Sequence, residues 1–225
     1  MTMLANHVGA LAATGHPVPD DAATVAAVEE LIGRTMASLT EQWQELASAV
    51  VPRPGVLHTD SVLELLTGMV DSGGKRLRPR MCHWGWVAGG GAAAGRGYDA
   101  MVRAASALEM LHAFALIHDD VMDASESRRG LPAVHVTARR QHVQLGGHGD
   151  AGRYGENIAI LVGDLAHSEA DLLMAGLPQR LRAIWRTLTV ELMLGQGRDL
   201  VGAANGRRDL AHARDPAQAS PLDRL

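Results

Sequence analysis

An apolar stretch that ends in three carboxylates constrains the fold of this chain more than any other feature. Residues 110–118 (MLHAFALIH) are nearly all apolar, and Asp119, Asp120 and Asp123 follow at once. On a helix, Asp119 and Asp123 lie four residues apart on one face, so their carboxylates point into the same volume. These like charges repel unless a cation joins them. Mg²⁺, whose other ligands are water and substrate phosphates, suits such a pair. A solvated acidic helix end is the alternative.

Composition favours a helical protein. The 225 residues suffice for one domain, which would bury roughly 70% of the surface of its unfolded chain. With 47% apolar but only 3% aromatic residues, the chain suits helices better than a β-sandwich. A net charge of −4 gives no indication of nucleic-acid binding.

Three further features indicate a cytoplasmic protein. Cys82 is the only cysteine, so no internal disulfide can form and a reducing compartment is expected. No run reaches the ~18 apolar residues that a transmembrane helix needs. Residues 1–19 lack the basic and apolar regions of a signal peptide, and we expect this N-terminus to be flexible.

Apolar residues at three- and four-residue steps, separated by Pro and Gly, predict an all-α fold. The segment 128–155 is expected to be mostly irregular, with one short helix. The last two helices are apolar on nearly all sides, which predicts deep burial. The expected helices cover residues 20–50, 59–72, 77–88, 99–123, 158–174 and 178–204.

Two cationic segments lie near the ends of predicted helices. In residues 73–79 (GGKRLRP), Lys75, Arg76 and Arg78 stand beside paired glycines at a helix start. Glycines allow close approach to the backbone, free N–H groups at the helix start favour an anion, and the cations supply charge and forked donors. Residues 128–130 (RRG) begin five residues after the last aspartate. Either segment alone can be a solvated loop, but together with the aspartates they predict a diphosphate site.

In this combination the chain resembles the trans-isoprenyl diphosphate synthases, or polyprenyl synthases. Residues 73–79 match the family's GGKRxRP motif, and residues 112–130 match its first aspartate-rich region. Gly163-Asp164-Leu165 and Gly195-Gln196-x-x-Asp199-Leu200 match two later signatures. The resemblance runs from about residue 20 to residue 206. It implies an isoprenoid synthase-type bundle of α-helices around a central cavity.

The resemblance also divides the candidate site residues into two groups. It implies that Mg²⁺ on an allylic diphosphate is held by Asp119, Asp120 and Asp123, while Arg128 contacts the same diphosphate. It implies that the diphosphate of isopentenyl diphosphate is bound by Lys75, Arg78, His112 and Arg129.

Three positions of this implied site, His112, Gln196 and Asp199, also have an alternative interpretation. His112 falls on the same helical face as Asp119, as a ligand-binding residue there would, although a core histidine is the other reading. Gln196, as a substrate-binding residue, and Asp199 would line the opposite wall of the cavity. A helix end that faces solvent is the alternative for both.

The implied activity is prenyl transfer. The allylic diphosphate ionises, the double bond of isopentenyl diphosphate attacks the carbocation, and a proton is lost. Mg²⁺ and arginines stabilise the departing diphosphate, while apolar walls exclude water. Product length in this family depends on the residues just before the first aspartate, here Phe114 and Ala115. An aromatic residue at this place resembles geranylgeranyl diphosphate synthases, so we expect a C20 product rather than C15.

The family pattern breaks after Asp199, because neither the family's Lys-Thr motif nor its second aspartate-rich motif follows. We therefore expect a partial isoprenoid synthase domain over residues 20–206, truncated before the family's C-terminal helices, and a divergent tail over residues 207–225. Such a domain would expose an apolar face larger than soluble monomers tolerate. This predicts a homodimer or heteromer through the helices after Gly155.

Two other functions stay open at this stage. One is a non-catalytic, diphosphate-binding or heteromeric subunit of a prenyl synthase. The other is a class I terpene cyclase, which also binds Mg²⁺ through a DDxxD motif but has little use for the cationic segment 73–79.

Overall fold

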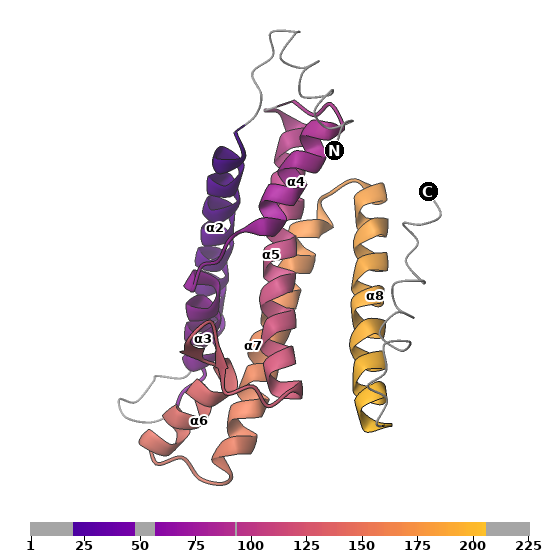
Figure 1. Cartoon of the computed structure of the whole chain (residues 1–225). Coiled ribbons are helices and arrows are strands. Elements are labelled where there is room, and N and C mark those ends of the chain that lie inside the picture. Colours follow the sequence, from indigo (N-terminus) through magenta and orange to yellow (C-terminus); the bar gives the residue numbers. More distant parts are fainter. Residues whose placement is uncertain (1–19, 48–56, 93, 206–225) are drawn as a thin grey trace. The chain divides into compact units, whose positions relative to one another are not determined.

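The computed structural model describes residues 20–47, 57–92 and 94–205, and within them the expected all-α fold is confirmed (Figure 1). The expectations for residues 1–19 and 207–225 lie outside the described residues. The helices are α2 (Asp21–Ala47), α3 (Asp60–Asp71), α4 (Leu77–Ala88), α5 (Arg96–Met122), α6 (Val134–Gln144), α7 (Ala151–Ala175) and α8 (Gln179–Ala204). Two short antiparallel strands, β1 (Ser127–Arg128) and β2 (Leu131–Pro132), form a hairpin between α5 and α6.

The chain divides into two compact units. Unit 1 spans Met1–Gly176 and contains α2 to α7, and unit 2 spans Leu177–Leu225 and contains α8. The aspartates and both cationic segments belong to unit 1, whereas α8 carries the Gly195–Leu200 motif and is described by itself.

Helix α5 is the central helix of unit 1. It packs most extensively against α7 and also against α2 and α4, which run beside it in Figure 1. Its side chains Met110 and Ile117 are each only 1% exposed, and burying a side chain of this size contributes roughly 1.5–3 kcal/mol. On α7, Ala159 and Ala166 are fully buried, and small residues allow the two helix backbones to approach closely. The core thus holds α5 on several sides, with the aspartates at its C-terminal end.

The structure corrects several predicted helix boundaries. Helix α5 begins at Arg96, so Asp99 lies in its first turn rather than before it. Helix α7 begins at Ala151, seven residues before the predicted start, because the side chain of Asp150 caps it by accepting a hydrogen bond from the N–H of Arg153 at 2.6 Å. The single short helix expected between residues 128 and 155 is α6. The predicted end of the first helix near residue 50 lies outside the described residues.

One described helix is long and apolar enough to cross a membrane by length and composition, although the sequence was expected to contain none. This helix is α5, and 61% of its most apolar 18-residue window is buried inside the fold. Buried core helices pass the same test of length and composition, so this property alone does not make α5 a membrane span.

The expectation of deep burial on all sides is wrong for α7 within the described residues. Leu161 and Leu172 of this helix are 54% and 62% exposed, although the opposite face is buried. Helix α7 therefore packs along one face only. Helix α8 belongs to unit 2, so its deep burial stays a prediction.

Candidate active site

The last turn of α5 presents two of its three aspartates on one side. Asp119 and Asp123 are joined through the backbone, where the N–H of Asp123 donates to the carbonyl of Asp119 at 2.8 Å. The Asp119 side chain is partly exposed and Asp123 is exposed. The four-residue spacing therefore places two accessible carboxylates over the same end of the helix, as the sequence predicts.

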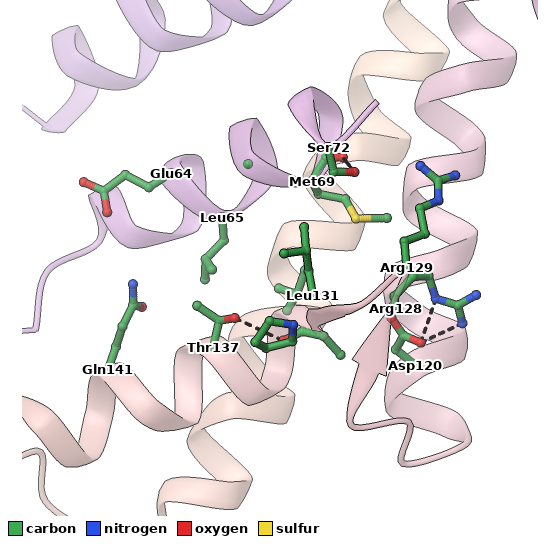
Figure 2. Close-up of a pocket in the computed structure, with 14 residues that line it drawn as sticks. Glu64, Leu65, Met69, Ser72, Asp120, Arg128, Arg129, Leu131, Thr137 and Gln141 are labelled. Carbon is green, nitrogen blue, oxygen red and sulfur yellow. Dashed lines mark hydrogen bonds and ion pairs between the residues drawn. The ribbon is translucent and has the colours of Figure 1, made fainter. Parts of the chain in front are cut away.

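Asp120 is arranged differently from its neighbours. It is only 2% exposed, and its carboxylate accepts two hydrogen bonds from Arg128, from Nε at 2.9 Å and from Nη2 at 2.6 Å (Figure 2). The same Nη2 lies 3.3 Å from the carboxylate of Asp119. The hydrogen bond to Asp120 is the main reason that the pKa of Arg128 is raised above its usual value. Asp120 thus holds Arg128 in this structure, and its role as a metal ligand stays a prediction.

Residues Arg128, Arg129 and Gly130 form the end of β1 and the turn of the hairpin. Arg128 pairs with Leu131 across the strands, so Arg129 and Gly130 form a two-residue loop. Both have positive φ, 53° and 80°, which is the signature of a type I′ turn. Figure 2 shows the two arginine side chains leaving the hairpin in different directions. Arg128 reaches the aspartates, whereas Arg129 donates from Nη1 to the backbone carbonyl of Gly73.

A cavity of about 520 Å³ brings the second predicted group together. Its cationic and imidazole side chains come from the start of α4 and the loop before it, from α5 and from the hairpin, three segments that are far apart in sequence. Gly74 also lines it, and a Cβ added there would lie 3.0 Å from Nη1 of Arg129, so glycine makes room for that side chain. The four predicted residues at this cavity are Lys75, Arg78, His112 and Arg129.

His112 is neutral at physiological pH in this setting. Burial, together with the positive charges of Arg78, Arg129 and Arg128, lowers its pKa from 6.5 to about 4. A neutral imidazole can donate one hydrogen bond to a phosphate oxygen without repelling the surrounding cations. Because His112 lines the cavity and is half-buried, its position favours the ligand-binding prediction over that of a core histidine.

Sequence reasoning missed an ion-pair cluster behind this cavity. Arg76 donates from Nε to Glu29 of α2 at 3.1 Å and from Nη1 to Glu109 of α5 at 3.0 Å. Burial lowers the pKa of Arg76, but the hydrogen bonds to Glu109 and Glu29 outweigh it and raise the pKa overall. The available signal was Glu109 itself, the one acid in residues 100–118, about one turn before His112.

The Gly163-Asp164 signature packs against α5. The Nε2 atom of His118 lies 3.2 Å from the carbonyl of Ile160 and 3.5 Å from the carboxylate of Asp164. A Cβ on Gly163 would come within 2.2 Å of the His118 ring, so only glycine allows this contact. The motif therefore joins α7 to the turn of α5 just before the aspartates.

The residues predicted to control product length lie on the same part of α5. Phe114 is buried, and its ring centroid is 4.5 Å from that of His118 and 4.9 Å from that of His167. Ala115 is half-buried. Their role in product length stays a prediction.

Gln196 and Asp199 lie three residues apart on α8. Helix α8 belongs to unit 2, so the expectation that they line the opposite wall of the site stays a prediction.

The donors at the end of α5 fit a Mg²⁺ ion that is shared with a substrate. Within the described parts of the chain, no group of three or more His, Cys, Asp or Glu side chains could hold a metal ion without other ligands. Mg²⁺ keeps several waters and is commonly held by one or two carboxylates together with substrate phosphates. Asp119 and Asp123 supply such a pair, and Arg128 hydrogen-bonds to both Asp119 and Asp120 beside it.

Comparison with known proteins identifies the family. The model of the polyprenyl synthetase family matches residues 59–215, which include both cationic segments and the three aspartates. The chain belongs to the polyprenyl synthetase family.

Individual relatives agree with this assignment. The chain is 40% identical to a geranylgeranyl diphosphate synthase from Methanosarcina mazei, over 45% of this chain and 25% of that one. It is 41% identical to a geranylgeranyl diphosphate synthase from Sulfolobus acidocaldarius, over 48% of this chain and 27% of that one. A geranylgeranyl pyrophosphate synthase from Corynebacterium glutamicum, solved in complex with isoprenyl diphosphate and magnesium, is 29% identical with a TM-score of 0.69.

The structural match covers 84% of this chain and 54% of the Corynebacterium protein. The similarity confirms the isoprenoid synthase fold expected from the sequence. The chain spans about half the length of that solved relative, and the aligned segments cover about a quarter of the two curated relatives.

Proposed function

We propose that this chain is a Mg²⁺-dependent prenyltransferase that condenses isopentenyl diphosphate with an allylic diphosphate. The observation that carries the proposal is the pairing of two anion sites. Two accessible carboxylates and Arg128 stand at the end of α5, and Lys75, Arg78, His112 and Arg129 surround one cavity. The hairpin residues Arg128 and Arg129 are adjacent in sequence and contribute one to each site.

In this proposal each side chain has a definite task. Asp119 and Asp123, with Asp120 beside them, would hold Mg²⁺ on the allylic diphosphate, where the ion supplies electrostatic stabilisation of the departing group. Arg128 binds the same diphosphate with its forked donors. Lys75, Arg78 and Arg129 orient the second diphosphate, and neutral His112 donates a hydrogen bond to it.

The chemistry follows from this orientation. The C–O bond of the allylic substrate breaks and its electron pair leaves with the diphosphate. The double bond of isopentenyl diphosphate attacks the resulting carbocation, so that a C–C bond forms and a proton is lost. Positioning the two substrates side by side removes much of the entropic barrier to this reaction.

We also propose a C20 product, with Phe114 and Ala115 limiting the length of the growing chain. The names of the curated relatives support a product of this size. The proposed setting is the cytoplasm, supported by the single cysteine of the sequence. Residues 20–206 are proposed to form a partial synthase domain, with Gln196 contributing to substrate binding.

A second candidate function is a non-catalytic, diphosphate-binding subunit of a prenyl synthase. It is favoured by the exposed apolar side chains of α7, such as Leu161 and Leu172, which suit a homodimer or heteromer contact after Gly155. A terpene cyclase is disfavoured, because it has little use for the cavity at Lys75 and Arg78.

The test is a product assay on the purified chain. Radiolabelled isopentenyl diphosphate is incubated with Mg²⁺ and an allylic diphosphate of five, ten or fifteen carbons, and prenyl products are separated by chain length. A C20 product that disappears on addition of EDTA is the expected result. Binding of isopentenyl diphosphate without any product from a folded chain would favour the non-catalytic subunit, and cyclic hydrocarbon from a C20 substrate alone would favour the cyclase.

A further inference from the structure

Glu109 is an unexpected residue in a site for an anion. It lines the same cavity as Lys75 and Arg78 and is only 9% exposed. A buried carboxylate there repels a diphosphate and must itself be desolvated, so its presence disfavours binding unless it has another task.

The contacts of Glu109 indicate what that task is. One carboxylate oxygen accepts a hydrogen bond from Nη1 of Arg76 at 3.0 Å. The other oxygen is buried, has no hydrogen-bond partner, and lies 3.8 Å from Nη1 of Arg78. Arg76 is held on its other side by Glu29 of α2. Arg76 therefore bridges α2 and α5 through two carboxylates.

The backbone of Arg76 gives this bridge a structural consequence. Arg76 has φ 46° and ψ 42°, a left-handed conformation, at the position just before α4 begins. A residue other than glycine in this region costs on the order of 1–3 kcal/mol and persists only where its surroundings hold it. The left-handed turn lies between Lys75 and Arg78, so it sets the directions in which both cations enter the cavity.

We infer that Glu109 is a positioning residue for the isopentenyl diphosphate site, which acts by holding Arg76 in its left-handed turn. This inference rests on the proposed function. Glu109 holds the loop in the shape that directs Lys75 and Arg78 toward one diphosphate, and the geometric gain outweighs the repulsion that its charge exerts on the ligand.

The direction in which Glu109→Gln changes the dissociation constant distinguishes a positioning role from a purely electrostatic one. If Glu109 acted only through its charge, Glu109→Gln would tighten anion binding, because a repulsive group is removed. If it positions the loop, the same variant weakens binding, because an amide holds Arg76 less firmly than a carboxylate. Isothermal titration of the full chain with isopentenyl diphosphate, and separately with inorganic pyrophosphate, is the measurement. We expect both dissociation constants to rise about tenfold, which corresponds to about 1.4 kcal/mol.

A further variant, Arg76→Lys, keeps the inference testable if Glu109→Gln does not fold. Arg76→Lys keeps the charge but cannot bridge two carboxylates with a planar fork, so it is expected to weaken binding to a similar degree. The double variant is expected to bind no more weakly than the single variant with the higher dissociation constant, because both changes break the same bridge.

Glu30→Gln is the matched control, since Glu30 is an exposed acid that also pairs with an arginine, Arg34, on α2. Its dissociation constants are expected to stay within twofold of the parent chain.

The outcomes are distinguishable. Tighter or unchanged binding by Glu109→Gln, or effects of the two substitutions that simply add, would overturn the positioning role while leaving the prenyltransferase proposal intact. Failure of the unsubstituted chain to bind either ligand would overturn the proposed function and the inference together.

Discussion

The two proposed anion sites of this protein are built in contrasting ways. The carboxylate site at the end of α5 is assembled from residues 119–128, within one helix end and the hairpin that follows it. The cationic cavity takes Lys75 and Arg78 from the start of α4 and the loop before it, His112 from α5 and Arg129 from the hairpin. The first site depends on helix spacing, whereas the second depends on how three distant segments pack. A substitution in residues 119–128 should therefore affect the carboxylate site alone. The cationic cavity should also respond to substitutions of residues that never touch a ligand.

The largest expected effect is a loss of turnover when the carboxylate site alone is changed. Asp119→Asn or Asp123→Asn should lower Mg²⁺-dependent turnover by about a thousandfold, at the upper end of what removing one electrostatic group costs. Binding of isopentenyl diphosphate without metal, measured by titration, should stay within twofold because the cavity is unchanged. Equal turnover in the variants and the parent chain would rule out the metal assignment.

The second effect is on stability and concerns Asp120. Asp120→Ala removes the main partner of Arg128, which is 28% exposed and still has Asp119 at 3.3 Å, so the expected loss is that of a charged hydrogen bond, about 1.5–3 kcal/mol. Urea unfolding at neutral pH should show this loss. Asp123→Ala, which removes an exposed carboxylate of the same motif, is the control and should change the free energy of unfolding by less than about 0.5 kcal/mol. Comparable losses in the two variants would contradict the assignment of Asp120 to Arg128.

A smaller effect is expected on KM when a residue of the cationic cavity is replaced. Lys75→Ala should raise KM for isopentenyl diphosphate about tenfold, as expected for the loss of one charged contact, and it should change KM for the allylic diphosphate little. Steady-state kinetics with each substrate varied in turn measures the difference. If the larger change fell on the allylic substrate, Lys75 would belong to the other site.

The smallest expected effect is a pH dependence at His112. Its pKa is lowered from 6.5 to about 4 in the folded chain, so the unfolded chain binds a proton between these values and the folded chain does not. The free energy of unfolding therefore includes a contribution from His112 that is complete above pH 6.5 and declines as the pH falls toward 4. Urea titrations at several pH values should show a shallower decline for His112→Gln than for the parent chain. Identical pH profiles would show that His112 does not contribute.

Several elements followed directly from the sequence. The helix from Leu77 to Ala88 begins and ends where its Pro and Gly signals predict, because local backbone preferences decide those positions. The start of α7 was misplaced, because the Gly-, Arg- and His-rich residues before Ile158 give a weak periodic signal that the Asp150 cap and tertiary packing override. The directions in which the side chains of Lys75 and Arg78 enter the cavity were not predictable either, because they depend on the left-handed backbone conformation of Arg76.

By itself, the sequence determined that Asp119 and Asp123 share one face of a helix, that glycines and cations stand at the start of α4, and that the chain belongs with helical diphosphate enzymes. These properties depend on spacing and residue type, which act over a few residues. Only the tertiary structure decided that Asp120 binds Arg128 and that Glu109 holds Arg76. The physical reason is that a buried charge must find its partner in space, and that partner is selected by the packing of whole helices rather than by distance along the chain.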